Sequence, residues 1–231
     1  MKLSEMSNDK RIEISNKVYP FFSAITRDLL FWGVINTIFL TEVKNFSAAQ
    51  ISSLAMFGNL VVILLYPFIF KIIKKFGNVA SIKLGISLYF GAAILITFSS
   101  KYFVILLGYI LYTLASAFKC MDNVVLRKNL KYINNEKDYI KIQNKSSFIH
   151  SFFTMIIAFS AGFWFNLNNY LPMILCILIC GFNLMLSNVI YENQNNENAK
   201  NENKENGERK AKNKLLMTKI IFLIVLLYGT L

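Results

Sequence analysis

The chain has 231 residues, of which 55% are hydrophobic and only 16% charged, and its formal net charge is +12. The charges are confined to a few blocks between long apolar runs, which indicates an integral membrane protein and not a soluble domain. A single histidine, and three cysteines without a Cys-x-x-Cys pair, exclude a histidine-based zinc site and disfavour disulfide chemistry. We expect neither a metal site nor a cofactor.

The first apolar run, residues 21–41, contains two adjacent charges, Arg27 and Asp28. A helix of this length spans roughly 30 Å, the thickness of a bilayer's hydrocarbon core. On a continuous helix the two charges point about 100° apart, so each needs its own partner or a water-filled cavity. We interpret Arg27 and Asp28, with Asn36 and Thr37 on the same span, as candidates for solute binding or proton coupling. The structural alternative is that Arg27 snorkels to the interface while Asp28 pins the helix to a neighbour.

Further apolar runs cover residues 51–70, 84–100 and 102–118. Residues 146–191 carry no formal charge and are long enough for two more spans, with a break expected between Asn166 and Pro172. The sequence therefore predicts an all-α integral membrane protein with a six-helix bundle over residues 21–191.

The remaining segments are predicted from composition. Residues 1–20 form a polar N-terminal segment, and residues 192–214 are rich in Asn, Glu and Lys, which is typical of a flexible charged linker. Residues 215–231 look like the truncated start of a seventh helix, since a span needs roughly 20 apolar residues. We expect the chain to be an incomplete, N-terminal half of a longer protein.

The distribution of basic residues predicts the orientation. Of the 25 Lys and Arg residues, 22 lie in the N-terminal segment, in residues 71–83 and 119–145, and in the linker with its continuation to residue 219. The positive-inside rule places all of these in the cytoplasm, so the net charge reflects orientation and nucleic acid is not an expected partner.

Two stretches resemble a bacterial subgroup of the major facilitator superfamily. Residues from Asp28 read Asp-Leu-Leu-Phe, and residues 40–51 read Leu-Thr-x-x-Lys-x-x-Ser-x-x-Gln-Ile, as at helix 1 and its exit in that subgroup. Residues 119–145, with Asp122 and a Lys-Asp-Tyr-Ile-Lys-Ile-Gln run, are similar too. The resemblance implies twelve spans with a solute site between two six-helix halves.

The loop after the second span departs from that family. Its usual pattern, Gly-x-x-x-Asp-x-x-Gly-Arg-Lys, holds a cytoplasmic gate closed. Here Phe70 and Lys74 replace the glycine and the aspartate, Gly77 matches, and residues 78–79 replace the basic pair. Lys74, Lys75 and Gly77 are the candidate gate-loop residues, and they indicate topology more than a gating mechanism.

Other residues have a functional and a structural interpretation. Lys119 and Asp122 lie three apart on one helix face and are candidate partners for the first-span charges, although an interfacial position is preferred. His150 is a candidate proton relay or an interfacial residue. Gly108 and Gly162 are expected to allow close helix approach.

No span contains paired carboxylates or a His-Glu-x-x-His, Gly-x-Ser-x-Gly or Cys/His arrangement, so we expect no enzyme. We expect a secondary carrier for a small solute in a bacterial plasma membrane, with its N-terminus in the cytoplasm. Besides lipid and solute, its expected partner is a second six-helix half or a second copy. The alternative is a non-transporting six-span accessory or scaffold protein.

Overall fold

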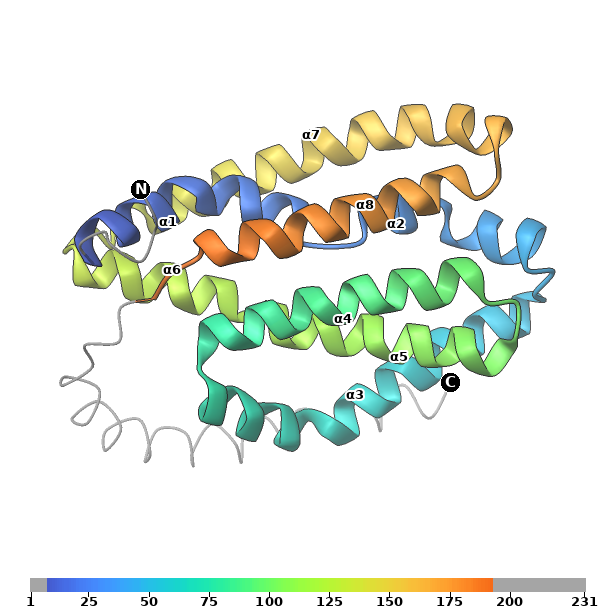
Figure 1. Ribbon diagram of the computed structural model, residues 1–231, viewed down its shortest axis with the longest axis horizontal. Coiled ribbons are helices and arrows are strands. Elements are labelled where there is room, and N and C mark those ends of the chain that lie inside the picture. Colours follow the sequence, from blue (N-terminus) through green and yellow to red (C-terminus); the bar gives the residue numbers. More distant parts are fainter. Residues whose placement is uncertain (1–7, 193–231) are drawn as a thin grey trace, which may run out of the picture. The chain divides into compact units, whose positions relative to one another are not determined.

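The computed structural model describes residues 8–192, and the secondary structure in this range is helical (Figure 1). The expectations for residues 1–7 and 193–231, including most of the linker and the seventh helix, lie outside the described residues. A π-helix, Phe39–Val43, extends the second helix, and a short 3-10 helix, Ser187–Val189, extends the last. The α-helices are, in chain order, α1 (Asn8–Ile25), α2 (Leu30–Ile38), α3 (Ala48–Phe76), α4 (Asn78–Phe98), α5 (Tyr102–Lys119), α6 (Met121–Tyr132), α7 (Asp138–Leu167) and α8 (Leu171–Leu186).

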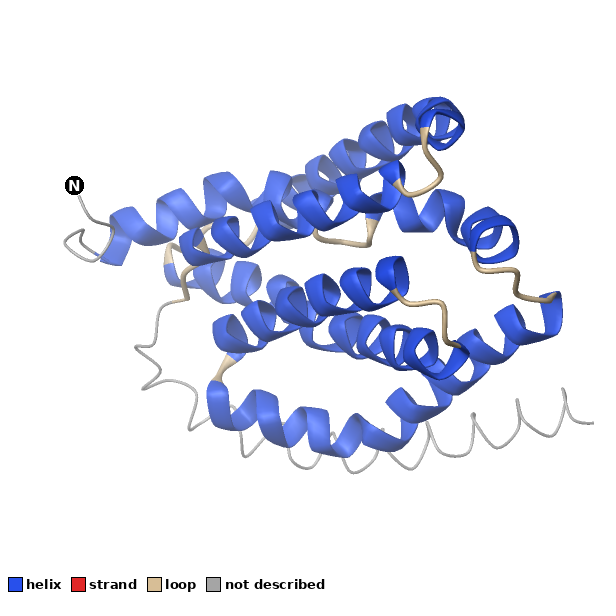
Figure 2. Ribbon diagram, turned by 45° about the vertical axis from the view of Figure 1, so that its right-hand side comes forward, coloured by secondary structure: helices blue, strands red, loops and turns tan. Residues whose placement is uncertain are grey.

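These helices make six segments that are long and apolar enough to cross a membrane, which confirms the predicted number of spans in the described part of the chain. The first span is broken between α1 and α2. The fourth consists of α5 and α6, which are separated only by a one-residue turn at Cys120 with helical dihedral angles. Short turns join the spans (Figure 2). The turn at residues 168–170 lies where the sequence predicted a break between the last two spans.

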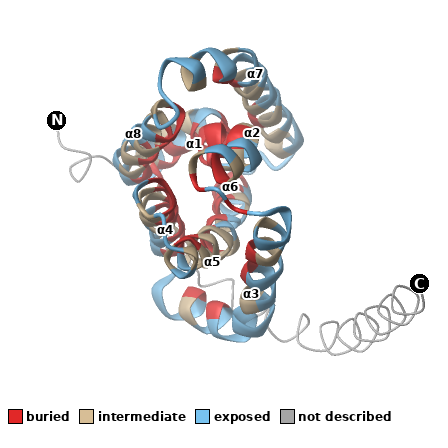
Figure 3. Ribbon diagram, turned by 90° about the vertical axis from the view of Figure 1, so that its right-hand side faces the viewer, coloured by how far each residue is buried: buried red, intermediate tan, exposed pale blue. Residues whose placement is uncertain are grey.

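The packing of the spans follows an internal pattern. The first span lies mainly against the fifth and sixth, while the fourth lies mainly against the second and third, and the third also packs on the sixth. If span 1 is exchanged with span 4, span 2 with span 5 and span 3 with span 6, the same pairs of spans are in contact. Figure 3 looks along the helices, with α7 and α3 at opposite ends of the arrangement. These two helices form the least buried spans, which leaves broad apolar faces for lipid or a partner.

A buried lysine joins the end of the first span to α4. Lys44 is 6% exposed, and its Nζ donates a 2.7 Å hydrogen bond to the Thr97 carbonyl in the last turn of α4. The same ammonium lies 5.1 Å from the ring centroids of Phe39 and Tyr170. Burial lowers the pKa of Lys44, because desolvation disfavours its charged form. The hydrogen bond and the two rings offset that cost.

The start of α3 is fixed by its own side chains. Ser47 Oγ accepts from the Gln50 backbone N–H, and the Gln50 side chain accepts from the Ser47 backbone N–H, which makes a capping box. At the other end, Gly77 has φ +85° between α3 and α4, a conformation that favours glycine. These devices explain the sharp reversals on both sides of the second span.

Close contact between α4 and α5 depends on two glycines. A Cβ at Gly85 would lie 2.9 Å from the Ala115 carbonyl oxygen and 3.0 Å from the Lys119 amide nitrogen. A Cβ at Gly108 would lie 2.8 Å from Ile96 Cγ1, which agrees with the close approach expected there. The same expectation for Gly162 is wrong, because a Cβ at that position meets nothing within 4 Å.

We predict that Gly85→Ala lowers the free energy of unfolding by about 1–3 kcal/mol, because the methyl group meets backbone atoms that cannot turn aside. Gly162→Ala is the matched control, and its better helix propensity should leave stability equal or raise it by up to about 1 kcal/mol. Thermal unfolding of the purified protein in detergent measures both. Equal effects of the two substitutions would contradict the close α4–α5 packing.

Candidate functional site

The first span is broken where its charges lie. The sequence predicted one continuous helix over residues 21–41, and this is wrong, since α1 ends at Ile25 and α2 begins at Leu30. Thr26 Oγ1 donates a 2.6 Å hydrogen bond to the Phe22 carbonyl, and Asp28 Oδ1 accepts a 2.7 Å hydrogen bond from the Leu29 N–H. Such local side-chain hydrogen bonds compete with the backbone hydrogen bonds of a continuous helix. Arg27 and Asp28 are therefore in a non-helical segment, and the helical wheel does not apply to them.

Three other helices satisfy the carbonyls left open at the end of α1. Lys119 Nζ of α5 donates to the Ser23 carbonyl at 3.4 Å. His150 Nδ1 of α7 lies 2.9 Å from the Ala24 carbonyl, and Nδ1 carries the proton because a carbonyl oxygen only accepts. Asn183 Nδ2 of α8 donates to the Ile25 carbonyl at 3.2 Å. His150, a candidate relay from the sequence, thus stabilises the broken backbone.

Lys119 and Asp122 form a buried ion pair beside the break. Their Nζ and Oδ2 atoms are 3.0 Å apart, and Ser23 Oγ of α1 donates a 2.8 Å hydrogen bond to the same Oδ2. Lys119 is 7% exposed and Asp122 1%, so the pair is buried inside the bundle, while its expected position at the membrane interface stays a prediction. The pair links α5 to α6 across Cys120, and its hydrogen bonds with Ser23 connect both to α1.

Arg27 and Asp28 do not pair with Lys119 and Asp122 as the sequence suggested. Arg27 is exposed, and its Nη2 donates to Ser147 Oγ at 3.2 Å. It shares with Ser23, Lys119 and Asp122 the lining of a cavity of about 190 Å³. Among residues 8–192, neither Arg27 nor Asp28 belongs to an ion pair.

Asp28 lies among aromatic side chains. Its Oδ1 accepts a 2.7 Å hydrogen bond from Tyr112 Oη of α5, and no described group donates to Oδ2, which faces Gly33. The ring centroid of Tyr112 is 5.9 Å from that of Tyr109, which is 5.9 Å from that of Trp32. Asp28 also precedes the N-terminus of α2, where the helix dipole favours negative charge. The second carboxylate oxygen remains available to a cation, a proton or a solute donor.

The other candidates from the first span lie farther along α2. Asn36 is half-buried and Thr37 exposed, and Thr37 Oγ1 donates to Asn36 Oδ1 at 2.9 Å. The structure does not bring them into contact with Asp28. They bond to each other on the next turns of the same helix.

The gate-loop candidates lie apart from this cluster. Lys74 and Lys75 are exposed at the end of α3, and neither makes an ion pair with a described residue. Gly77 forms the turn into α4, as expected from its position between two spans.

Sequence reasoning missed Tyr112 and Asn183. Both lie in otherwise apolar spans, and a polar group within such a span was the available signal; Asn183 is buried and Tyr112 half-buried. Within residues 8–192 there is no group of His, Cys, Asp or Glu side chains suited to hold a metal ion. The arrangement offers charges and hydrogen-bonding groups for a solute or a proton.

We predict that Asn183→Leu destabilises the protein by about 1–3 kcal/mol, because it leaves the Ile25 carbonyl buried without a donor. Asn166→Leu, the same substitution at an exposed position of α7, should have little effect. Thermal unfolding in detergent compares the two. If the two variants unfold alike, Asn183 does not support the broken helix.

A second prediction concerns the buried ion pair. Lys119→Met should cost about 3–5 kcal/mol of stability, since it leaves Asp122 charged and buried, and adding Asp122→Leu should restore most of it. Lys128→Met is the control, because Lys128 pairs with Glu192 at a lysine side chain that is 43% exposed, and its loss should cost at most about 1 kcal/mol. Equal losses for Lys119→Met and Lys128→Met would refute the buried pair.

Comparisons with known proteins leave the site to be interpreted from its chemistry. A scan against protein-family models, a search of curated proteins and a search of solved structures each found no match to this chain. The functional conclusion therefore rests on the residues and contacts given above.

Proposed function

We propose that this protein is a secondary transporter of the major facilitator type, in which the six described spans form one helical bundle. It moves a small solute across the membrane by alternating access. A second six-helix half or a second copy of the chain completes the carrier, and the solute site faces that partner. The resemblance at residues 28–31 and 40–51 and the interrupted first span both favour this function.

The observation that carries the proposal is the break in the first span at Arg27 and Asp28, together with the turn in the fourth span beside it. In transporters built from inverted repeats, helices broken at corresponding positions of the two repeats mark the binding site. Here the first and fourth spans correspond under the exchange of spans 1–3 with spans 4–6. The first is broken over residues 26–29, and the fourth has a one-residue turn at Cys120, whose backbone stays in the right-handed helical region. Lys119 and Asp122, which flank Cys120, bond to Ser23 near the end of α1. Tyr112, about two turns earlier on α5, bonds to Asp28.

The charges at the break have separate roles in this proposal. Asp28 binds the solute or the coupling proton, with Tyr112 holding one carboxylate oxygen and leaving the other open. Arg27 attracts an anionic group from the cavity that it lines. Lys119 and Asp122 satisfy each other and keep the first and fourth spans together.

Orientation and location follow from the same proposal. The excess of Lys and Arg in alternate loops favours an N-terminus in the cytoplasm of a bacterial cell, with the protein in the plasma membrane. The exposed apolar faces of α3 and α7 meet lipid or the partner bundle. No catalytic step is needed for this activity.

The test measures flux through vesicles that contain the purified chain. We expect uptake of ethidium, a cationic dye chosen to complement the Asp28 carboxylate, to depend on an imposed proton gradient. Asp28→Asn keeps the size of the side chain but removes its charge, and should reduce this uptake by about tenfold or more. The rate of dye uptake and the internal pH are followed in the same vesicles.

Glu136→Gln, which neutralises an exposed loop carboxylate, is the control and should transport like the unaltered protein. Gradient-dependent uptake that Asp28→Asn leaves unchanged would contradict the role of Asp28. Absence of flux of ethidium and protons from protein shown to be folded in the vesicle would favour the accessory or scaffold function instead.

A further inference from the structure

A second cavity lies at the end of the bundle that carries the start of α1, away from the break. Its volume is about 580 Å³, and it is lined by α1 from Asp9 to Pro20, the end of α6 with the following turn, and the start of α7. Its lining residues are Asp9, Lys10, Glu13, Asn16, Lys17, Pro20, Leu130, Ile133, Asn135, Asp138, Lys141, Ile142 and Lys145. None of them belongs to the proposed transport site.

The charges of this cavity are unbalanced. Four lysines line it, and none makes an ion pair with a described carboxylate. Two of its three carboxylates are already engaged, since Asp138 accepts from Asn135 Nδ2 at 2.7 Å and Asp9 accepts from Tyr132 Oη at 3.2 Å. These donors are uncharged, so both carboxylates keep their charge, and the four ammonium groups face three carboxylates. The excess positive charge favours an anion.

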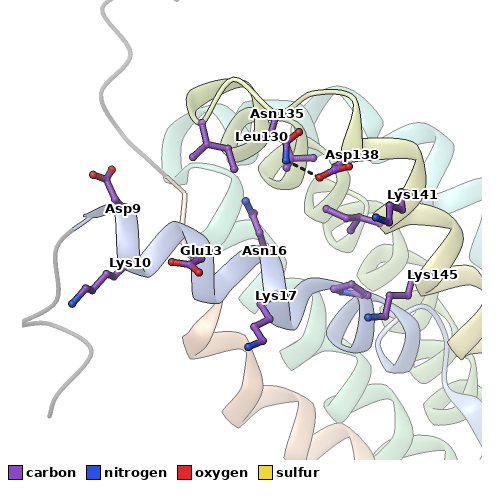
Figure 4. A pocket seen from close by; sticks show the side chains of 13 residues that line it. Asp9, Lys10, Glu13, Asn16, Lys17, Leu130, Asn135, Asp138, Lys141 and Lys145 are labelled. Carbon is purple, nitrogen blue, oxygen red and sulfur yellow. Dashed lines mark hydrogen bonds between the residues drawn. The ribbon is translucent and has the colours of Figure 1, made fainter.

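An unsatisfied amide points to a specific ligand and not to bulk counterions. The side-chain Nδ2 and Oδ1 atoms of Asn16 are both buried and have no hydrogen-bond partner among the described residues. Figure 4 shows Asn16 extending from α1 toward Leu130 and Asp138, with Lys141 and Lys145 on α7 at one side. A buried amide without partners costs about 1–3 kcal/mol, and a bound ligand would remove that cost.

The lining also limits the chemistry of the anion. Lys141 and Lys145 are one helical turn apart, so they present two ammonium groups on one face of α7. Pro20, Leu130 and Ile142 add an apolar wall, and the volume exceeds what an inorganic ion requires. Lysines act as point charges for phosphate, and basic pockets between membrane helices hold phosphate headgroups.

We propose that this cavity binds a phosphate group attached to an organic moiety, held by Lys141, Lys145 and the Asn16 amide. The apolar wall contacts the organic part. The same chemistry is offered by an anionic phospholipid headgroup and by a soluble phosphate ester.

The test uses the full 231-residue protein in a neutral detergent. Binding of phosphatidylglycerol, and separately of glycerol phosphate, is titrated by native mass spectrometry and by the shift in thermal unfolding. Diacylglycerol, which lacks the phosphate, is the ligand control. Saturable binding of phosphatidylglycerol alone assigns a lipid site, and binding of glycerol phosphate assigns a soluble ligand.

The double variant Lys141→Gln/Lys145→Gln should weaken phosphate binding by about tenfold or more. Lys71→Gln/Lys75→Gln removes two exposed lysines with the same spacing from α3 and should leave binding unchanged. Asn16→Leu should also weaken binding, yet it should raise the unfolding temperature of the ligand-free protein, because it removes a buried amide without partners.

Three results would overturn the proposal. They are no saturable binding of either phosphate probe, equal weakening by the two lysine double variants, and diacylglycerol binding that is as tight as that of phosphatidylglycerol. The opposite behaviour of Asn16→Leu in stability and in binding keeps the test informative if the lysine variants fold poorly.

Discussion

The organisation of this bundle depends on how the backbone at the end of α1 is satisfied. A helix that stops inside an apolar bundle exposes carbonyl oxygens that water does not reach, and each costs several kcal/mol unless it finds a donor. Lys119, His150 and Asn183 provide those donors from three other helices. The positions of α5, α7 and α8 around the first span are therefore fixed by hydrogen bonds as well as by apolar contact.

The same break places Arg27 and Asp28 outside the regular backbone hydrogen bonds of a helix. Asp28 keeps one oxygen on Tyr112 and the start of α2, while its other oxygen has no donor in the described chain. Arg27 turns toward a polar cavity and a serine hydroxyl. By contrast, Lys119 and Asp122 neutralise each other and are fully committed to structure. A membrane-buried charge is thus functional or structural according to whether the protein supplies its partner.

The number of spans and the turns between most of them could be predicted, because bilayer thickness sets the length of an apolar run and glycine or asparagine marks the turns. The break at residues 26–29 could not be predicted. Mean hydropathy is the same for a broken and a continuous helix, and a helical wheel assumes that the helix is continuous. The spacing of Lys119 and Asp122 placed them on one helix face, but as candidate partners for the first-span charges. Their pairing with each other is seen only in the folded bundle, where Asp122 accepts from Ser23, 99 residues away along the chain. His150 was recognised as unusual, whereas its contact with the Ala24 carbonyl is a property of the assembled bundle.

The partners of α1 also have a consequence for how the protein is made. Asn183 follows Ile25 by 158 residues, so at roughly 5–20 residues per second it leaves the ribosome about 8 to 32 seconds after the carbonyl that it satisfies. Lys119 and His150 are made earlier, so the Ile25 carbonyl is the last of the three to find its donor. The break in the first span thus receives its last donor only after the sixth span has been made, and the bundle closes last around its first helix.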